Sequence, residues 1–490
     1  MANLFFIRYL GSDKDRFFPQ YTPFTQTVGH NQLDFVLLKE IQLMKFCLNL
    51  YLIVVGCLFF TACKETIKNS PKTVAPSATN NNTSQPLKIS KAVLKDKVLG
   101  MLVGSAIGDA MGAPTEMWQR ENIQTEYGFV QQLDEMVRAP SPEGTWQMNL
   151  PAGGTTDDTR WKNLLTDFII EEGSDFYQKE GSNPYHFAAF ITKFYEGKIK
   201  ALKQVDSFSP APYEVALMEM SWLQEWAVVA KPFSEKDLEG YTYALNHFYG
   251  GEPTCAGMLY APMIGLVHPD EAASAYQSAY RLGIFDLGYA RDITGLTAAM
   301  TAAAMSPMAS PESILAILRD IDPNGYFNSR LVGRSAHRFY KDALYSVAAA
   351  KKMTKADIDV TKITLPYQKQ DTLYFAQLQQ LFDDLDAKNE DMAFHPGEIH
   401  QINLTALLFT NFDFQKSMEF VVNYGRDNDT VAAITGAILG ALHGYSNLPK
   451  ESAALVLAVN KNQLGIDLEA MAEQLVEFMV AEGKVIIEQG

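Results

Sequence analysis

The chain contains little cysteine. Of four cysteines in 490 residues, Cys47, Cys57 and Cys63 lie in one short N-terminal stretch, and Cys255 stands alone beyond it. The part of the chain after Cys63 therefore cannot form an internal disulfide, which excludes a disulfide-stabilised scaffold and means that oxidising surroundings are tolerated but not required. We interpret Cys255 as a buried, small apolar side chain, with a reactive thiol as the alternative.

Basic residues are also scarce. The chain has 41 Lys and Arg against 57 Asp and Glu, a formal net charge of −16 and a pI near 5.0. A nucleic-acid surface needs clustered Lys and Arg against the phosphate backbone, so we expect no nucleic-acid partner. A phosphate-bearing ligand would need local cations, supplied by an arginine or by a metal ion.

Alternating strand patterns bounded by turn residues are few, and the dominant period from about Lys91 onward is helical. Leu404, Leu407 and Leu408 share one helix face at i, i+3, i+4 spacing. The segments Ile293–Met305 and Glu271–Gly283 are rich in alanine, which has high helix propensity. We predict an all-α fold, with one large helical domain over residues 89–490.

One hydrophobic run lies near the N-terminus. The stretch MKFCLNLYLIVVGCLFFTACKET begins at Met44 with a single lysine and closes on the small residues Thr61 and Ala62 before Cys63. This is the layout of a signal peptide, and the run is short for a membrane span. Its ending FTAC resembles the lipobox of bacterial lipoproteins, with Phe60 in place of the usual leucine. The alternative is a permanent N-terminal anchor helix.

This resemblance implies acylation at Cys63 and a lipid-anchored protein of the bacterial cell envelope, at the outer membrane or the periplasmic face. We predict a signal peptide over residues 44–62 and a flexible tether over 63–88, whose Ser, Thr, Asn, Pro and Lys cannot bury enough apolar surface to fold. Residues 1–43 precede a plausible start at Met44, and we interpret them as a non-native or unstructured extension.

Two segments carry a small residue at every fourth position, a pattern that lets neighbouring helices approach closely. Neither contains a purely apolar run of about 18 residues, so we predict two core helices that pack together as a rigid platform and do not span a membrane. The two rows are Gly100, Gly104 and Gly108 in KAVLKDKVLGMLVGSAIGDAMGAP, and Ala432, Gly436 and Gly440 in NYGRDNDTVAAITGAILGALHG.

Six carboxylates lie among glycines and other small residues. They are Asp109 and Glu116 in GSAIGDAMGAPTEMW, Asp157 and Asp158 in AGGTTDDTRW, and Asp427 and Asp429 in GRDNDT. A single acid before a helix is an ordinary N-cap, but a helix needs one cap and the last two stretches each supply two acids. Carboxylates brought together repel one another unless they are protonated or bridged by cations.

Oxygen ligands from Asp, Glu and Thr, with no Cys or His nearby in the sequence, suit hard divalent ions and not zinc. Mg²⁺, Mn²⁺ and Ca²⁺ all fit such ligands. Two such ions about 3.5–4 Å apart could polarise a water molecule and a substrate hydroxyl together.

Taken in order, GMLVGSAIGDAMGAPTE, TTDDT and NYGRDNDTVAAITGAILGALHG resemble the three motifs of the ADP-ribosylglycohydrolase family, which includes the bacterial enzyme that reactivates dinitrogenase reductase. The resemblance covers roughly residues 94–444. It implies a single large orthogonal helical domain of that family's type around two divalent metal ions, with Mg²⁺ expected first and Mn²⁺ or Ca²⁺ as alternatives. By position, the implied metal ligands are Glu116, Thr156, Asp157, Asp158, Asp427, Asp429 and Thr430.

The resemblance also implies roles for individual residues. Glu116 and Asp158 are the expected catalytic residues, Glu116 acting as a ligand or as a base. The expected substrate-binding residues are Gly257 and Met258 in the loop CAGMLYAPMIG, Asp109 as a hydrogen-bonding residue behind the site, and Arg426 as a partner for phosphate or carboxylate. A solvent-facing Arg426 is the alternative.

The sequence departs from the family pattern after this loop. Many members have a Thr-His pair there, whereas this chain has GIFDLGYARDIT, with Asp286, Tyr289, Arg291 and Asp292. The predicted metal ligands are complete, so the departure bears on the identity of the substrate.

The expected function is hydrolysis of the bond at C1 of ribose in ADP-ribosyl or related ribosyl groups, on a small molecule or on a protein. Two alternatives stay open at this point. One is a lipid-anchored protein that binds ADP-ribose or a nucleotide sugar without turnover, and the other is a hydrolase of another glycoside or nucleoside. We expect a monomer that contacts the membrane only through its N-terminal lipid.

Overall fold

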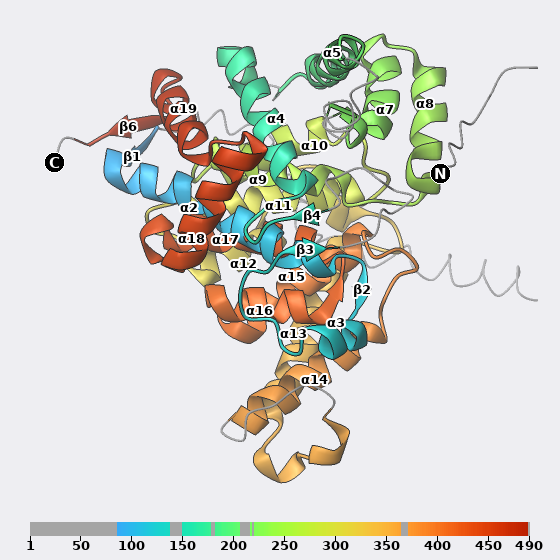
Figure 1. Cartoon of the computed structure of the whole chain (residues 1–490), viewed down its shortest axis with the longest axis vertical. Helices are drawn as coiled ribbons and strands as arrows, with labels where there is room; N and C mark the ends of the chain where they lie inside the picture. Colours follow the sequence, from blue (N-terminus) through green and yellow to red (C-terminus); the bar gives the residue numbers. More distant parts are fainter. Residues whose placement is uncertain are drawn as a thin grey trace, which may run out of the picture. The chain divides into compact units, whose positions relative to one another are not determined.

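The computed structural model in Figure 1 describes residues 86–137, 149–177, 182–205, 216–217, 220–363 and 371–488. Helices dominate these residues, and the strands among them form three two-stranded sheets. The predicted all-α fold is therefore confirmed. The predicted extension, signal peptide, lipidation site at Cys63 and tether as far as residue 85 lie outside the described residues.

The α-helices follow one another along the described chain, and most of the connections between them are short. They are α2 (Lys91–Gly112), α3 (Arg120–Glu126), α4 (Asp157–Glu172), α5 (Pro184–Leu202), α7 (Gln224–Ser234), α8 (Leu238–His247), α9 (Ala261–Leu266), α10 (Ala272–Leu282), α11 (Ala290–Ala304), α12 (Pro311–Asp320), α13 (Ser335–Lys352), α14 (Thr372–Asp386), α15 (Pro396–Thr410), α16 (Phe414–Tyr424), α17 (Asn428–His443), α18 (Lys450–Val459) and α19 (Leu468–Ala481).

The strands are short and pair at the edges of the helical core. They are β1 (Leu87–Ile89), β2 (Trp118–Gln119), β3 (Met136–Val137), β4 (Asn149–Leu150), β5 (Gly425–Arg426) and β6 (Val485–Ile487). β1 pairs parallel with β6, with Leu87 opposite Val485, whereas β2 with β5 and β3 with β4 are antiparallel. The β1–β6 pair joins the two ends of the described fold.

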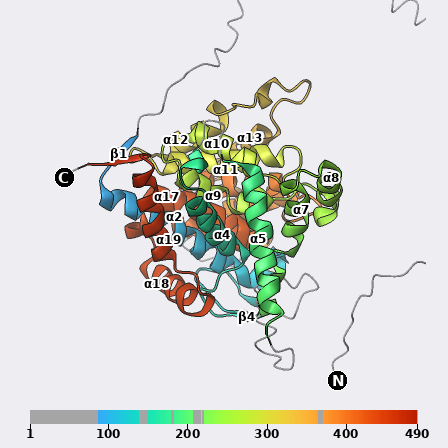
Figure 2. The same cartoon turned by 90° about the horizontal axis from the view of Figure 1, so that it is seen from above.

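The centre of the fold is a pair of helices, α2 and α17, that lie against each other (Figure 1, Figure 2). A Cβ atom at Gly104 would come within 2.4 Å of the carbonyl oxygen of Gly436, and a Cβ at Gly436 within 2.1 Å of the carbonyl oxygen of Gly104. The same contact recurs one turn away, between Gly100 and Gly440. The predicted platform of two glycine-stepped helices is confirmed, because only backbone fits between them.

Both helices belong to the core of the protein. Val98 of α2 and Ile438 of α17 are fully buried among the side chains of other helices. In the described part of the chain, no helix has both the length and the apolar character needed to cross a bilayer.

The paired helices also bring two of the acidic motifs together. α2 ends at Gly112, a short 3₁₀ turn follows over Ala113–Thr115, and Glu116 comes next in non-helical backbone. Pro114 explains the end of the regular α-helix, because proline has no backbone N–H to donate to the preceding turn. Ala113 itself keeps helical backbone, at φ −46° and ψ −42°. A Cβ at Gly112 would lie 2.4 Å from the Cα of Asp429, so the end of α2 meets the start of α17.

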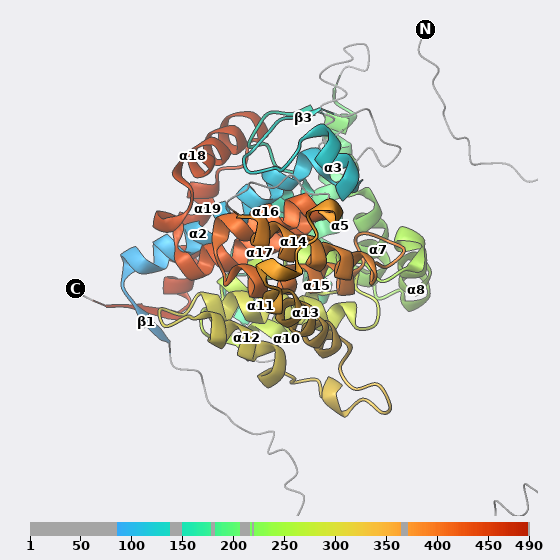
Figure 3. The same ribbon diagram turned by 90° about the horizontal axis from the view of Figure 1, so that it is seen from below.

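The other helices surround this pair. In all three views α18 and α19 lie on one side of it, and α7 and α8 lie on the opposite side (Figure 1, Figure 2, Figure 3). α4 packs against α2, α17 and α19. The start of α4, which carries the second acidic motif, is thereby held near the junction of α2 and α17.

Candidate metal centre

Asp109, on α2, fixes the position of the second acidic motif. Its carboxylate accepts four hydrogen bonds, from the backbone N and hydroxyl of Thr156 at 2.8 and 3.0 Å and from those of Thr159 at 3.0 and 2.5 Å. Thr156 caps α4 by accepting from the backbone N of Asp158 at 3.4 Å. Asp109 thus holds the start of α4, and its predicted contact with substrate stays a prediction.

Two side-chain contacts join the second motif to the third. The hydroxyl of Thr156 lies 3.1 Å from Oδ2 of Asp429, and the hydroxyl of Thr430 donates to Oδ2 of Asp158 at 2.9 Å. These pairs are separated by more than 270 positions in the chain. The structure therefore brings Thr156 and Asp158 of the second motif beside Asp429 and Thr430 of the third.

Glu116, Asp427 and Asp429 form a buried group of carboxylates, which we call the acid triad. One oxygen from each lies within 4.8 Å of the other two, and the residues are only 2 to 4% exposed. Asp427 stands at the cap position of α17, yet its side chain makes no capping hydrogen bond. Oδ1 of Asp429 is buried and has no hydrogen-bond partner among the described residues.

Such an arrangement fits a hard divalent cation. A buried acceptor without a donor is costly, and a buried charge needs a partner. The triad offers oxygen atoms alone, which are the ligands that Mg²⁺, Mn²⁺ and Ca²⁺ prefer. The orphan oxygen of Asp429 is the observation, independent of the clustering itself, that points to a ligand here.

The pKa values of these acids reflect their burial and their mutual repulsion. Loss of solvation, followed by the charges of Glu116 and Asp158, raises the pKa of Asp427 to about 7. The same loss of solvation, followed by the charge of Asp158, raises the pKa of Asp109 to about 6. The pKa of Asp429 is raised well above its usual value, first by burial and then by Glu116 and Asp427. A cation would favour the charged forms.

A buried lysine lies beside this group, and the sequence analysis missed it. Nζ of Lys162 is 3.4 Å from Oδ1 of Asp158 and donates to the backbone carbonyl of Asp158 at 3.0 Å, and both side chains are 1% exposed. Because Thr430 binds the other oxygen, both carboxylate oxygens of Asp158 have protein partners. The i, i+4 spacing in DDTRWK was the available signal, but such pairs usually lie on exposed helix faces.

The glycine-containing loop begins against the acid triad. Sγ of Cys255 lies 3.7 Å from Oδ2 of Asp427, and burial raises the pKa of this thiol well above its usual value, with a further contribution from Asp427. The thiol is thus a protonated donor, in line with its interpretation as a buried residue. Gly257 and Met258 are also buried, and their contact with a substrate stays a prediction.

The residues that depart from the family pattern hold the framework around the site. The backbone N of Gly257 donates to Oδ1 of Asp286 at 2.8 Å, which anchors the loop. Asp292 accepts two hydrogen bonds from Arg334, at 2.9 and 2.7 Å, and neither side chain is exposed. The hydroxyl of Tyr289 lies 3.1 Å from Nε2 of His395. Nε of Arg291 donates to the carbonyl of Gly283 at 2.9 Å.

The guanidinium of Arg426 is engaged by another part of the protein. It contacts both carboxylate oxygens of Glu398, at 2.7 and 2.9 Å, and donates to the carbonyl of Glu390 at 2.7 Å. Its backbone pairs with Trp118 in the β2–β5 sheet. The carboxylate partner of Arg426 is therefore internal, and its binding to a substrate phosphate stays a prediction.

Comparison with known proteins gives one extended match and two short ones. The family model described as ADP-ribosylglycohydrolase matches residues 90–484. The uncharacterized protein YegU of Escherichia coli (strain K12) is 33% identical over 76 residues, which are 16% of this chain and 22% of that protein. An uncharacterized protein of Archaeoglobus fulgidus is 37% identical over 78 residues, or 16% of this chain and 23% of that protein. The chain thus matches less than a quarter of the length of either relative.

A solved structure also resembles the fold. It is described as an ADP-ribosylglycohydrolase-related protein complex and is 16% identical in sequence, with a TM-score of 0.46. The alignment covers 79% of this chain and 99% of that one.

Proposed function

The chain belongs to the ADP-ribosylglycohydrolase family, and from this premise we propose that it is a metal-dependent hydrolase that cleaves the bond at C1 of ribose in ADP-ribosyl or related ribosyl substrates. The observation that carries the proposal is the acid triad, buried and with an orphan oxygen on Asp429. We propose two divalent ions, Mg²⁺ first, with Mn²⁺ and Ca²⁺ as alternatives. Their donors would be Glu116, Thr156, Asp157, Asp158, Asp427, Asp429 and Thr430.

When bound, such ions supply positive charge that polarises hydroxyl and water oxygens. The chain's own residues bind and orient the substrate, and they transfer the protons. In the proposed reaction the oxygen of a water molecule bonds to C1, the C1–N or C1–O bond breaks, and the water proton passes to a carboxylate and then to the leaving group. Glu116 is the proposed base, because it follows the end of α2 and belongs to the acid triad.

The remaining carboxylates have an electrostatic part in this reaction. As the bond to the leaving group breaks, positive charge develops on the ribose, and negative groups held in a buried site stabilise it. Asp158 is held in one orientation by Lys162 and Thr430. We propose that Asp158 orients the substrate and that its negative charge stabilises the ribose as the bond breaks, while Glu116 transfers the proton.

Release of free ADP-ribose tests the proposal. The compact part of the chain from Thr83 onward would be incubated with ADP-ribosylated arginine, ADP-ribosylated serine and ribosyl small molecules, in the presence of Mg²⁺, Mn²⁺, Ca²⁺ or EDTA, and the products separated by chromatography. We expect release that needs a divalent ion. Tight binding of ADP-ribose without release from any substrate would favour a binding protein, and release from other glycosides or nucleosides alone would favour the second alternative.

We further propose that the protein is anchored to the bacterial envelope through a lipid on Cys63, and that its substrate reaches it there. The support is the signal-peptide layout that ends in FTAC. Expression of the chain and of its Cys63→Ser variant, with labelled palmitate, tests this. We expect label in the membrane fraction for the unaltered chain alone, and equal labelling of both would contradict the proposal.

A further inference from the structure

The connection between α12 and α13 exposes two adjacent apolar side chains at its tip. Leu331 is 95% exposed and Val332 is 72% exposed. The backbone of Leu331 stands at φ +73°, in the left-handed region, which a bulky side chain rarely adopts. Strain of this kind persists only where the surrounding structure holds it, and it is concentrated at functional positions. An exposed leucine on such backbone is therefore a candidate for contact with a partner.

Internal contacts hold the tip in place. Oδ2 of Asp322 accepts a hydrogen bond from the backbone N of Phe327 at 2.8 Å. The ring of Phe327 meets the ring of His337, in the first turn of α13, edge-on with ring centres 5.1 Å apart. The backbone N of Gly333 donates to the carbonyl of Ser329 at 3.1 Å. The tip is therefore a braced part of the fold, and its two apolar side chains face solvent.

Residues 330–352, which run from the tip along α13, are basic although the chain as a whole is acidic. They contain six Lys and Arg but a single acid, Asp342, in a chain with a net charge of −16. Arg334 pairs with Asp292 in the interior, and Lys351 donates to a backbone carbonyl near the end of α15. The four other cations are exposed, namely Arg330, Arg338, Lys341 and Lys352.

Two of these cations share a face of α13 with an exposed tyrosine. Arg338, Lys341 and Tyr345 are spaced at i, i+3 and i+7, which places them on one side of the helix, and Tyr345 is 67% exposed. The pKa of His337, which packs on the tip, is lowered first by burial and then by cations, of which Lys341 is the first. Positive charge therefore gathers where the tip meets α13. We call the following residues the basic surface: Arg330, Leu331, Val332, Arg338, Lys341 and Tyr345.

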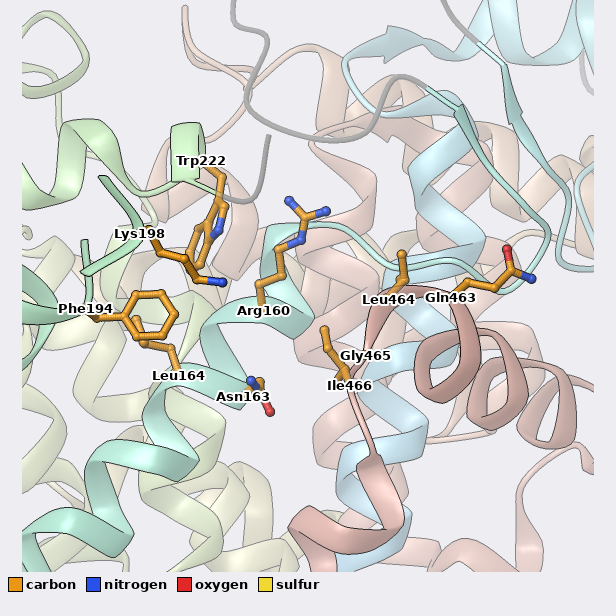
Figure 4. Close-up of a pocket in the computed structure, with 10 residues that line it drawn as sticks. All are labelled: Arg160, Asn163, Leu164, Phe194, Lys198, Trp222, Gln463, Leu464, Gly465 and Ile466. Atoms are coloured by element: carbon orange, nitrogen blue, oxygen red, sulfur yellow. The ribbon is translucent and has the colours of Figure 1, made fainter. Parts of the chain in front are cut away.

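The pocket of about 370 Å³ beside α4 is a different kind of feature (Figure 4). It is also lined by two cations, Arg160 and Lys198, but both side chains already have partners within the chain. The cations of the basic surface, in contrast, are exposed to solvent. The basic surface is therefore the better candidate for attracting an anionic partner.

We propose that the basic surface binds a bilayer that contains anionic lipids. Leu331 and Val332 enter the boundary between the headgroups and the acyl chains, while Arg330, Arg338 and Lys341 lie against lipid phosphates. Apolar side chains flanked by Lys and Arg are the composition of surfaces that lie at such a boundary.

The small apolar area favours a bilayer over an acidic protein. A stable protein interface covers about 800 Å² on each partner around an apolar centre, whereas the tip offers two apolar side chains. None of the residues of the basic surface belongs to the acid triad, so the proposal does not depend on the hydrolase. It does not depend on the lipid at Cys63 either, although both would bring the folded part to a membrane.

Sedimentation with vesicles tests the proposal. The compact unit from Thr83 onward contains the whole described hydrophobic core, from Ile89 to Val485, so it can fold without the hydrophobic run that begins at Met44. Vesicles of phosphatidylcholine are compared with vesicles that also contain phosphatidylglycerol, at low and at high salt. We expect binding to the anionic vesicles alone, and weaker binding at high salt. The acidic character of the chain predicts repulsion, so such binding requires a local basic surface.

Leu331→Asn tests the apolar contact. Asparagine tolerates left-handed backbone better than leucine does, so the melting temperature should stay the same or rise. The affinity for anionic vesicles should fall by about 10-fold to 100-fold, because a buried leucine side chain is lost from the bilayer. Leu238→Asn is the matched control, since Leu238 lies on α8 and is also exposed, at 76%. It should leave vesicle binding unchanged.

Replacement of Arg338 and Lys341 by glutamine tests the charge. The affinity should fall by about 5-fold for each cation removed, since that is the contribution of one Lys or Arg near an anionic membrane. Lys193→Gln, on the exposed side of α5, removes a lysine that pairs with Glu171 and should have no effect. Absence of binding to both kinds of vesicle, equal binding to both, or binding that Leu331→Asn and the charge variants leave unchanged would overturn the proposal.

Discussion

At the scale of single residues, the acids of the centre differ in what holds them. The carboxylate of Asp109 accepts four hydrogen bonds from residues at the start of α4. Both carboxylate oxygens of Asp158 have partners, Lys162 and Thr430. Asp429 has one oxygen without a partner among the described residues. Removing its charge should therefore affect a bound cation more than the fold.

Asp429→Asn is expected to weaken the binding of Mn²⁺ by more than about 10-fold, because a charged ligand is lost. The metal-free variant should melt at the same temperature as the unaltered chain or higher, since repulsion from Glu116 and Asp427 is relieved. Calorimetric titration and thermal melting in EDTA measure the two effects. Glu477→Gln, on the exposed face of α19, is the control, and equal loss of binding in both variants would contradict the assignment.

Lys162→Met is expected to lower the free energy of unfolding of the metal-free protein by about 3–5 kcal/mol, because Asp158 is left buried without its cation. Urea unfolding in EDTA measures the change. Lys193→Met removes a lysine from an exposed ion pair and should change little. Equal stability of the two variants would mean that the buried pair contributes nothing.

At the scale of elements, the contact of α2 with α17 positions Glu116 and Asp429. Gly436→Ala is expected to destabilise the protein by about 1–3 kcal/mol or more, because its Cβ would meet the carbonyl oxygen of Gly104 at 2.1 Å. It should also weaken the binding of divalent ions, since the two helices must move apart. Urea unfolding and calorimetry test both effects.

Gly197→Ala is the matched control for this variant. Gly197 lies within α5, and a Cβ there would meet no atom within 4 Å. Alanine should stabilise this helix by about 0.5–1 kcal/mol, because it has a higher helix propensity than glycine. A similar loss of stability in both variants would show that close packing is not what the central glycines provide.

The helical elements and the small-residue contacts could be predicted because they depend on local spacing. The row of Gly100, Gly104 and Gly108 and the turn at Pro114 each follow from residues a few positions apart. The Lys162–Asp158 pair could not be separated from an exposed helix pair, because its burial depends on other helices. The Arg426–Glu398 contact joins segments whose approach no local pattern encodes, and so it was missed.

At the scale of the whole molecule, the buried acids predict how stability depends on pH. From about pH 4 to pH 7 the unfolded chain has lost protons that folded Asp109 and Asp427 retain, because burial raises their pKa values to about 6 and about 7. The folded state then binds more protons, and these groups lower the free energy of unfolding as the pH rises through this window.

The rise in melting temperature on adding Mg²⁺ should therefore be larger at pH 8 than at pH 5, since a cation binds the deprotonated carboxylates. Comparing each sample with one in EDTA at the same pH removes other contributions. One of these is His268, whose pKa burial lowers to about 4, so that its contribution to stability is lost as the pH falls below its usual value. A Mg²⁺ effect that is independent of pH would contradict the prediction.

The backbone contact between α2 and α17 sets the longitudinal offset of the two helices. Sliding one helix by a single residue, about 1.5 Å, would also turn it by about 100° and place a side chain where only a glycine fits. Small shifts are therefore excluded, and the separation of Glu116 from Asp429 depends on the offset that the glycine contacts hold. A substitution in a surrounding helix that leaves this backbone contact intact should therefore leave the separation of Glu116 from Asp429 unchanged.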